Sequence, residues 1–308
     1  MNTLQAPRAV VMVRPHNFCS NPDTKGDNAF QITGGEPASV RKNALQEFDT
    51  AVETLRTSGV QVHVFDDTGT ATPDSVFPNN WFSTHSGGHI AIYPMHAPNR
   101  RLERRWDIIE ELKRSYRVQD VIDFSGLEED GLALEGTGAM VLDHIGRIAY
   151  TVKSNRADPV LLERFCTHFN YEPMAFEARD SQGCEVYHSN VLMGIGTDFA
   201  MICLSMISDS TRRAEIATRL EETGHEVIDL TEEQIQNFAG NAFALTGAAP
   251  LLALSGRALQ ALRPDQVSII ERSTTLLPLS IPTIETAGGS VRCMLAGIHL
   301  SPRERTPS

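Results

Sequence analysis

Residues 191–204 read VLMGIGTDFAMICL, a short apolar strand, a polar turn that contains glycine, and a second apolar strand. This pattern predicts a β-hairpin. Similar stretches recur about every 50 to 60 residues. They are WFSTHSGGHIAIYP at 81–94, AMVLDHIGRIAYTV at 139–152, AFALTGAAPLLAL at 242–254 and a truncated CMLAGIHL at 293–300. Self-similarity at a fixed period indicates a repeat architecture.

The segments between the hairpins also repeat, as a helix followed by a strand. Residues 97–116 carry apolar side chains at helical spacing, and the strand-like DVIDF follows them. Asp158 and Pro159 are typical of an N-cap and a first helical turn. Gly224 lies where the next helix should end. Each repeat is therefore predicted to be a hairpin, a helix and a strand.

The two ends of the sequence supply the remaining repeat. A strand at 9–15, together with a helix and a strand in 40–65, can join the strand at 293–300 and close a ring of five. We therefore predict an α/β fold in which residues 1–308 form one catalytic domain, a five-fold pseudosymmetric β/α propeller. In such a ring every repeat turns the same corner, just before its first hairpin strand, toward the centre.

These five corners carry side chains of different chemical kinds. In chain order they are Asn79–Asn80, Glu135, His188 with Asn190, the region of Asn241, and Arg292–Cys293. Symmetry alone would not place a carboxylate, an imidazole and a thiol at equivalent corners. Their convergence predicts a catalytic site at the centre of the ring.

Composition limits the partners and the compartment. The formal charge is −12 and the pI is near 5.3, which argues against nucleic acid or an anionic membrane as a partner. The sequence has no apolar run long enough to span a membrane, and its first residues lack the features of a signal peptide. Five scattered cysteines do not form a disulfide framework, so we expect a reducing cytoplasm. Cys184 with His188 lacks further ligands at metal spacing, so no metal is expected.

The corner motifs resemble those of the pentein superfamily, the enzymes that modify guanidino groups. LEGTG at 134–138, YHSN at 187–190 and GGSVRC at 288–293 resemble its Glu, His and nucleophilic Cys corners. The resemblance covers nearly the whole chain and implies the pentein fold, an amino-acid substrate and no cofactor. FPNNW and RCMLAG are similar to the amidinotransferase-like branch of citrulline-utilisation hydrolases.

Two positions depart from the arginine deiminases of this superfamily. Asn80 and Asn190 stand where those enzymes carry carboxylates that pair with the substrate guanidinium. A guanidinium is always charged and needs carboxylates in a dry pocket, whereas two unpaired buried carboxylates around a neutral ligand would each cost several kcal/mol. An amide can donate to a ureido oxygen and accept from its NH2. The paired change predicts a ureido substrate, with citrulline the first candidate.

The resemblance implies a role for each corner residue. Cys293 would attack the ureido carbon, and His188, oriented by Glu135, would protonate the leaving amine and then activate water. Asn80 and Asn190 would hold the ureido group. The products would be ornithine, ammonia and carbon dioxide.

The remaining candidates surround the substrate. Arg100 and Arg156 resemble residues that bind the α-carboxylate, Arg292 is a cation beside the nucleophile, and Asn79 is a substrate contact or a turn residue. The loop 14–31 has many turn formers and is an active-site lid or an ordinary surface loop.

Other functions remain open from the sequence. The same chemistry could act on a guanidino group, as in an arginine deiminase or amidinotransferase. A ring of repeats could also be a non-catalytic binding protein. Homo-oligomerisation is compatible with the sequence but not indicated by it.

Overall fold

The structure is a computed structural model that describes residues 4–26, 28, 30–32 and 34–303. It contains five separate three-stranded sheets. In each sheet the first two strands are antiparallel and the third runs parallel to the middle one. This arrangement confirms the predicted hairpin, helix and strand in four repeats, and in the remaining repeat the antiparallel pair comes from opposite ends of the sequence.

The strand bounds follow the chain. The first repeat has β15 (Ala296–Ile298), β1 (Ala9–Pro15) and β2 (Gln61–Asp67), and the second has β3 (Phe82–His85), β4 (His89–Ile92) and β5 (Asp120–Asp123). The third has β6 (Met140–Asp143), β7 (Ile148–Val152) and β8 (Glu172–Phe176), and the fourth has β9 (Met193–Ile195), β10 (Phe199–Ile202) and β11 (Glu226–Asp229). The fifth has β12 (Phe243–Thr246), β13 (Pro250–Ser255) and β14 (Thr275–Leu279).

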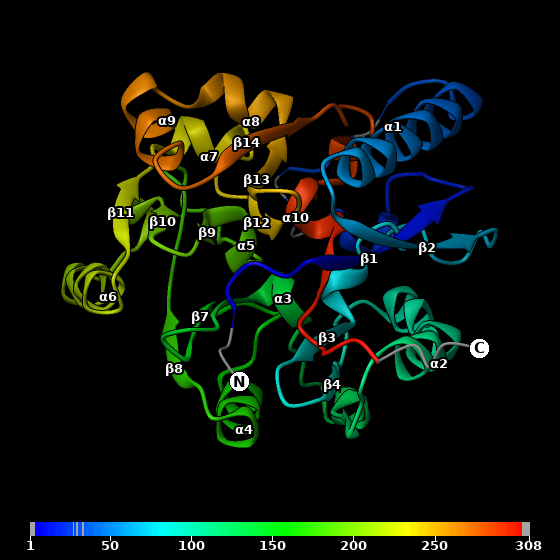
Figure 1. The fold of residues 1–308 in the computed structure, drawn as a ribbon, viewed down its shortest axis with the longest axis horizontal. Helices are drawn as coiled ribbons and strands as arrows, with labels where there is room; N and C mark the ends of the chain where they lie inside the picture. Colours follow the sequence, from blue (N-terminus) through cyan, green and yellow to red (C-terminus); the bar gives the residue numbers. More distant parts are fainter. Residues whose placement is uncertain (1–3, 27, 29, 33, 304–308) are drawn as a thin grey trace.

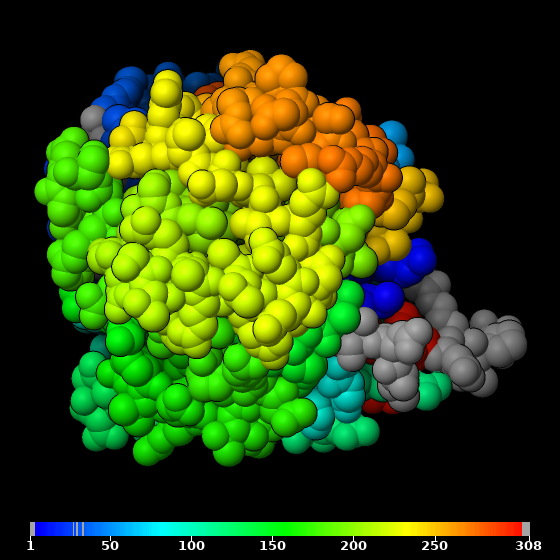
Figure 2. Space-filling view, turned by 90° about the vertical axis from the view of Figure 1, so that its left-hand side faces the viewer, coloured from blue at the N-terminus to red at the C-terminus, as the bar shows by residue number. Residues whose placement is uncertain are grey.

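Longer helices connect the second strand of each sheet to the third. They are α1 (Pro37–Thr57), α2 (Trp106–Ser115), α4 (Pro159–Phe169), α6 (Ser210–Glu222) and the pair α8 (Gly256–Ala261) and α9 (Pro264–Ile270). Figure 1 shows these helices around the outside of the ring. In Figure 2 the green, yellow-green and orange surfaces of three successive repeats follow one another from bottom to top.

Local sequence explains these elements. All residues of β6, β7 and β10 are buried, as expected for the apolar runs that signalled the repeat. Asp158 caps α4 by accepting from Val160 N at 2.8 Å, as predicted. Trp106 begins α2 but is 55% exposed, whereas Ile108, Ile109 and Leu112 form the buried face of that helix. No helix in the described ranges is long and apolar enough to cross a membrane.

The ring closes through strands from opposite ends of the sequence. β15 pairs antiparallel with β1, and Ala9 lies opposite Ile298. The first repeat is therefore assembled from both ends of the chain, as the sequence predicts.

Three one-turn helices at the centre of the ring were not expected from the sequence. They are α3 (Gly136–Ala139), α5 (Ser189–Leu192) and α10 (Val291–Met294), and Figure 1 shows them inside the circle of longer helices. The remaining short elements are α7 (Glu232–Gln236) and the 3-10 turns η1 (Pro22–Thr24), η2 (Pro78–Asn80), η3 (Pro98–Glu103), η4 (Ser125–Asp130), η5 (Leu204–Met206) and η6 (Ile284–Ala287).

The central turns pack closely on one another. Gly136 has a φ of 47°, and a Cβ there would lie 2.4 Å from Asn79 O. Only glycine suits both the conformation and this contact between α3 and η2.

A cluster of histidines lies elsewhere in the ring, with His85 and His144 buried and His299 partly buried. The ring centroids of His144 and His299 are 3.9 Å apart, and those of His85 and His144 are 6.4 Å apart. His144 Nδ1 and Tyr171 OH form a 2.8 Å hydrogen bond, and His85 Nε2 and Ser83 Oγ form one of 2.7 Å. Burial, followed by nearby cationic groups, lowers the pKa of all three histidines, that of His299 to about 4.

This cluster makes stability depend on pH. The unfolded chain protonates its histidines below about pH 6.5, whereas folded His299 remains neutral down to about pH 4. The contribution of neutral His299 to the free energy of unfolding is therefore complete above pH 6.5 and is lost as the pH falls. Between pH 7.5 and 5.0 we expect His299 to remove about 2 kcal/mol from the free energy of unfolding.

Urea unfolding at the two pH values measures this loss. His299→Gln should lose correspondingly less stability on acidification than the wild type. His16→Gln, which changes a partly exposed histidine beside Asp66, serves as the control. An identical pH dependence in His299→Gln and wild type would contradict the assignment.

Candidate active site

Cys293 lies in α10 and is 3% exposed. Its Sγ accepts from Asn190 Nδ2 at 3.2 Å and from Asn241 Nδ2 at 3.3 Å. Asn241 is itself fixed, because its Nδ2 also donates to Asn190 O and its Oδ1 accepts from Arg292 N. Two amide N–H groups thus point at the sulfur and hold it in place.

His188 and Glu135 form a buried pair. Both residues precede one-turn helices, His188 before α5 and Glu135 before α3. His188 Nε2 is 2.8 Å from Glu135 Oε2, and Glu135 Oε1 accepts from His96 N at 3.0 Å. An ionised carboxylate can only accept, so Nε2 carries the hydrogen and Nδ1 is the nitrogen available for proton exchange.

Their ionisation follows from burial and charge. Burial raises the pKa of Glu135, but the hydrogen bond from His188 and the charges of Arg156 and Arg100 outweigh it, so the net pKa is lowered. Burial lowers the pKa of His188, although Glu135 opposes this. The resting pair is a carboxylate and a neutral imidazole.

Arg100 and Arg156 lie beside this pair and are both buried. Arg100 forms a bidentate pair with Glu103, with both N–O distances at 2.9 Å, and its Nη1 is 3.5 Å from Glu135 Oε2. The Arg156 guanidinium lies 4.8 Å from the centre of the Tyr187 ring and 3.8 Å from Glu135 Oε2. With Asp74, whose Oδ2 is 3.6 Å from Arg100 Nε, two cations and three carboxylates form one buried network.

Arg292 was also predicted to be a site residue, but in the structure its side chain lies outside the catalytic pocket. Its guanidinium stacks on Phe243 at 4.0 Å and donates to Leu295 O at 3.2 Å. It lines a small separate cavity with His144 and His299. Neighbouring residues of a helical turn point in different directions, so a Cys293 that faces the catalytic pocket turns Arg292 away from it. The expected contact between Arg292 and substrate is therefore corrected.

The catalytic pocket is small. It brings together Asn80, Arg100, Arg156, His188 and Cys293, which are five of the predicted residues. Its free volume is about 20 Å³, enough for a water molecule but not for an amino acid. Substrate entry therefore requires some of the lining to move.

The loop 14–31 forms part of the lining that covers the catalytic pocket. In its described part, Asn28 lines the catalytic pocket and Asn28 Nδ2 donates to Ala287 O at 3.4 Å. Asn21 Nδ2 donates to Asp74 Oδ2 at 2.7 Å. This position over the site agrees with the lid alternative, and opening of the loop remains a prediction.

Several site residues were not singled out from the sequence. Asp74 lines the pocket, and its Oδ1 is buried without a hydrogen-bond partner in the described ranges. Asn241 was recognised only as a corner, with no role. Asp74 precedes its corner by several residues, and no periodicity marks it. Asn79, by contrast, is buried behind Asn80, and its backbone oxygen accepts from Thr137 Oγ1.

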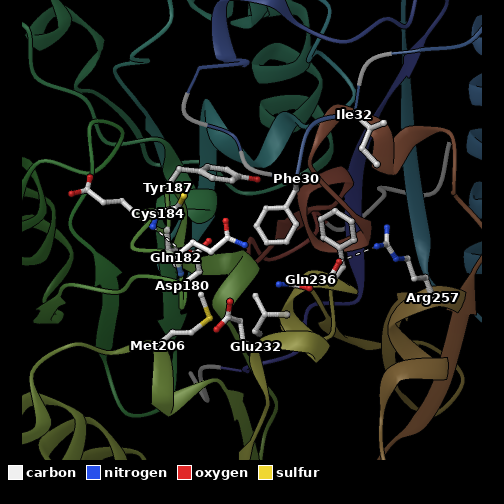
Figure 3. A pocket seen from close by; sticks show the side chains of 14 residues that line it. Phe30, Ile32, Asp180, Gln182, Cys184, Tyr187, Met206, Glu232, Gln236 and Arg257 are labelled. Carbon is white, nitrogen blue, oxygen red and sulfur yellow. Dashed lines mark hydrogen bonds between the residues drawn. The ribbon is translucent and has the colours of Figure 1, made fainter.

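A larger pocket of about 320 Å³ adjoins the catalytic one, and Tyr187 lines both. Figure 3 shows Phe30 and Tyr187 close together on its wall, with ring centroids 6.3 Å apart. Tyr187 OH also donates to Gly288 O at 2.5 Å. The wall between the two pockets thus includes a residue of the loop and one of the His188 corner.

Comparisons with known proteins agree with this architecture. The N-terminal domain of ArgZ, an arginine dihydrolase from the ornithine-ammonia cycle in cyanobacteria, has a TM-score of 0.72 at 15% identity, over 93% of this chain and 96% of that one. DDAH from Pseudomonas aeruginosa, complexed with citrulline, has a TM-score of 0.63 at 15% identity, over 94% and 98%. Unliganded AgrE has a TM-score of 0.72 at 16% identity, but only 40% of its chain is covered. A search among curated proteins found no match.

The sequence itself matches a family model over most of its length. The model is described as N,N dimethylarginine dimethylhydrolase, eukaryotic, and it matches residues 14–300. The chain therefore belongs to the N,N dimethylarginine dimethylhydrolase family, and with it to the pentein superfamily of enzymes.

Proposed function

We propose that this protein is a cysteine hydrolase of the ureido group of citrulline. Cys293 is the nucleophile, and the reaction passes through a carbamoyl-cysteine. The products are ornithine, ammonia and carbon dioxide. Within the hydrolase family, the proposal thus specifies a substrate whose reacting group, the ureido group, carries no charge.

The observation that carries the proposal is the amide environment of Cys293. Asn190 donates to Sγ, and its Oδ1 is buried without a partner among the described residues. That oxygen can accept from the NH2 of a bound ureido group. Asn80 supplies a second amide, in the lining of the pocket that contains Cys293. Neither side chain supplies the negative charge that a buried guanidinium needs.

The charges around the pocket favour the same substrate. Arg100 and Arg156 line it, whereas Asp74 supplies a single carboxylate to that lining. Because Arg100 is paired with Glu103, Arg156 is the cation in this lining that is expected to attract the α-carboxylate of an amino acid. A ligand with a neutral head and an anionic end fits this distribution.

Each step can be assigned to a residue. Cys293 gives its thiol proton to Nδ1 of the neutral His188 and attacks the ureido carbon, while Asn80 donates toward the oxygen on which charge develops. The bond from carbon to the substrate Nδ then breaks, and His188 delivers the proton that the departing amine needs. A water molecule, deprotonated by His188, hydrolyses the carbamoyl thioester. The carbamate released decomposes to ammonia and carbon dioxide.

The amino-acid end of the substrate has its own partners. Arg156, which lines the pocket, is assigned to the α-carboxylate, as the resemblance predicts. Asp74 Oδ1, buried and without a hydrogen-bond partner in the part of the chain that the structure describes, can accept from the α-ammonium group.

The second candidate is hydrolysis of a guanidino group, which the family description favours. Asp74 is the observation that supports it, because an unpaired carboxylate in the pocket could face a guanidinium instead of an ammonium. The two candidates make opposite predictions for citrulline and arginine.

The test compares product release from both amino acids. We expect wild-type protein to release ornithine and ammonia from citrulline with a kcat/KM at least about 100-fold above that for arginine, since a buried charge without a partner is strongly disfavoured. Cys293→Ser should form no product from either. Preferential release of citrulline or ornithine from arginine would establish the second candidate. No turnover by wild type, with Cys293 unreactive toward haloacetamides, would indicate a binding protein.

A further inference from the structure

Arg100 occupies an unusual position for a residue expected to bind the substrate carboxylate. It is 2% exposed, and although it lines the catalytic pocket, its guanidinium is directed at protein acceptors. Its Nε and one Nη2 hydrogen are taken by Glu103, and one Nη1 hydrogen is directed at Glu135 Oε2. Two N–H groups remain, one on each terminal nitrogen.

Asn80 takes both of these hydrogens. Its neighbours fix the orientation of the amide, with Oδ1 accepting from Nη1 and Nη2 of Arg100 at 3.0 Å each. In the same orientation Nδ2 donates to Asn79 Oδ1 at 3.2 Å. All five N–H donors of Arg100 then have acceptors within the protein.

The orientation decides what Asn80 can offer a ligand. An isolated amide can turn either its oxygen or its nitrogen toward a substrate, and so can accept or donate. Here the oxygen is held by Arg100, and the second N–H of Nδ2 remains as the group available to the pocket that Asn80 lines. That N–H matches a ureido oxygen and cannot accept from the N–H edge of a guanidinium.

We infer that Arg100 is a positioning residue that sets substrate specificity by fixing the Asn80 amide, and that it does not anchor the substrate carboxylate. The inference rests on the proposed ureido chemistry. Lysine cannot replace it, because a single ammonium lacks the two separated N–H groups that reach one oxygen while holding Glu103.

The experiment compares substrates with and without a carboxylate. Citrulline and N-carbamoylputrescine, its decarboxylated form, share the ureido group. Arg100→Lys keeps the buried charge, and thermal melting checks that it folds. We expect kcat/KM to fall on the order of 100-fold for both compounds equally, because misplacing Asn80 affects the ureido group alone. Arg156→Lys, the matched control, should affect citrulline much more than N-carbamoylputrescine.

A double-mutant cycle shows whether Arg100 acts through Asn80. In an Asn80→Ala background, Arg100→Lys should leave the ratio of citrulline to arginine turnover unchanged, whereas in wild type it should lower that ratio. A loss in Arg100→Lys that is at least tenfold larger for citrulline than for N-carbamoylputrescine would overturn the inference and establish a carboxylate anchor.

Two further readouts keep the result separate from the proposed function. Protection of Cys293 from iodoacetamide measures binding of either ureido compound even where turnover is slow. If wild type consumes arginine and not citrulline, the proposed function fails, and the comparison is made with arginine and agmatine. If Arg100→Lys lowers kcat/KM equally for arginine and agmatine, the positioning role is still supported. A much larger loss for arginine, which carries the carboxylate, would still overturn it.

Discussion

Glu135→Gln is expected to lower kcat for citrulline by about 10³- to 10⁴-fold while leaving the fold intact. Glu135 Oε2 accepts from His188 Nε2 at 2.8 Å and so keeps the hydrogen on that nitrogen. A glutamine amide can present its NH2 instead, which stabilises the tautomer with the hydrogen on Nδ1. Loss of the equivalent carboxylate in the serine protease triad, through the same wrong tautomer, costs about 10⁴-fold.

The pH dependence of the rate separates this effect from a general disturbance. Glu135 raises the pKa of His188 against the effect of burial, so its removal should lower that pKa further. The acid limb of the profile of kcat/KM against pH should therefore move to lower pH. Glu128→Gln is the matched control, since Glu128 also pairs with an arginine, Arg104, at 2.7 Å and accepts from a backbone N–H. A Glu135→Gln enzyme with more than a tenth of wild-type kcat would contradict this role.

Gly138→Ala is expected to lower kcat/KM for citrulline by about 10²- to 10³-fold. A Cβ at Gly138 would lie 2.1 Å from a terminal atom of the Asn80 amide and 2.9 Å from His188 Nδ1. Both side chains would have to move away from the pocket. A misplacement of about 1 Å in a reacting group can cost 100-fold, and here two groups are displaced.

Stability should respond in a different way from activity. Gly138 lies in α3 without a positive φ, so alanine suits its backbone, and the clash is with side chains that can shift. Thermal melting of Gly138→Ala should remain within a few degrees of wild type. Gly256→Ala, where a Cβ meets open space, is the control and should retain full activity. An active Gly138→Ala enzyme would show that Asn80 and His188 do not require their present positions.

The sequence was informative where structure is local or repeated. The alternation of apolar strands and polar turns identified the four hairpins and the truncated copy at 293–300, and the matching corners led to Glu135, His188 and Cys293. The same reasoning predicted that β15 would complete the sheet begun by β1, because four full repeats leave one half-repeat at each end.

Features that depend on contacts between repeats were not accessible in this way. Asp74 reaches the pocket because Asn21 and Arg100 lie against it, and neither contact has a sequence period. The direction of Arg292 depends on the one-turn helix α10, which is too short to produce a helical pattern. Asn80 was predicted to contact substrate, but the orientation of its amide follows from its contacts with Arg100, 20 residues further along the chain.

The pairing of β1 with β15 has a consequence for synthesis. The ribosome makes β1 first, and β15 and the nearby Cys293 are made after the other four repeats. At roughly 5–20 residues per second, β1 waits tens of seconds with one edge unpaired. An unpaired edge strand can pair with other chains, so nascent chains are expected to be exposed to aggregation during this interval. Cys293 cannot reach Asn190 and Asn241 before α10 has been made, so chains that stop short of α10 have no assembled active site.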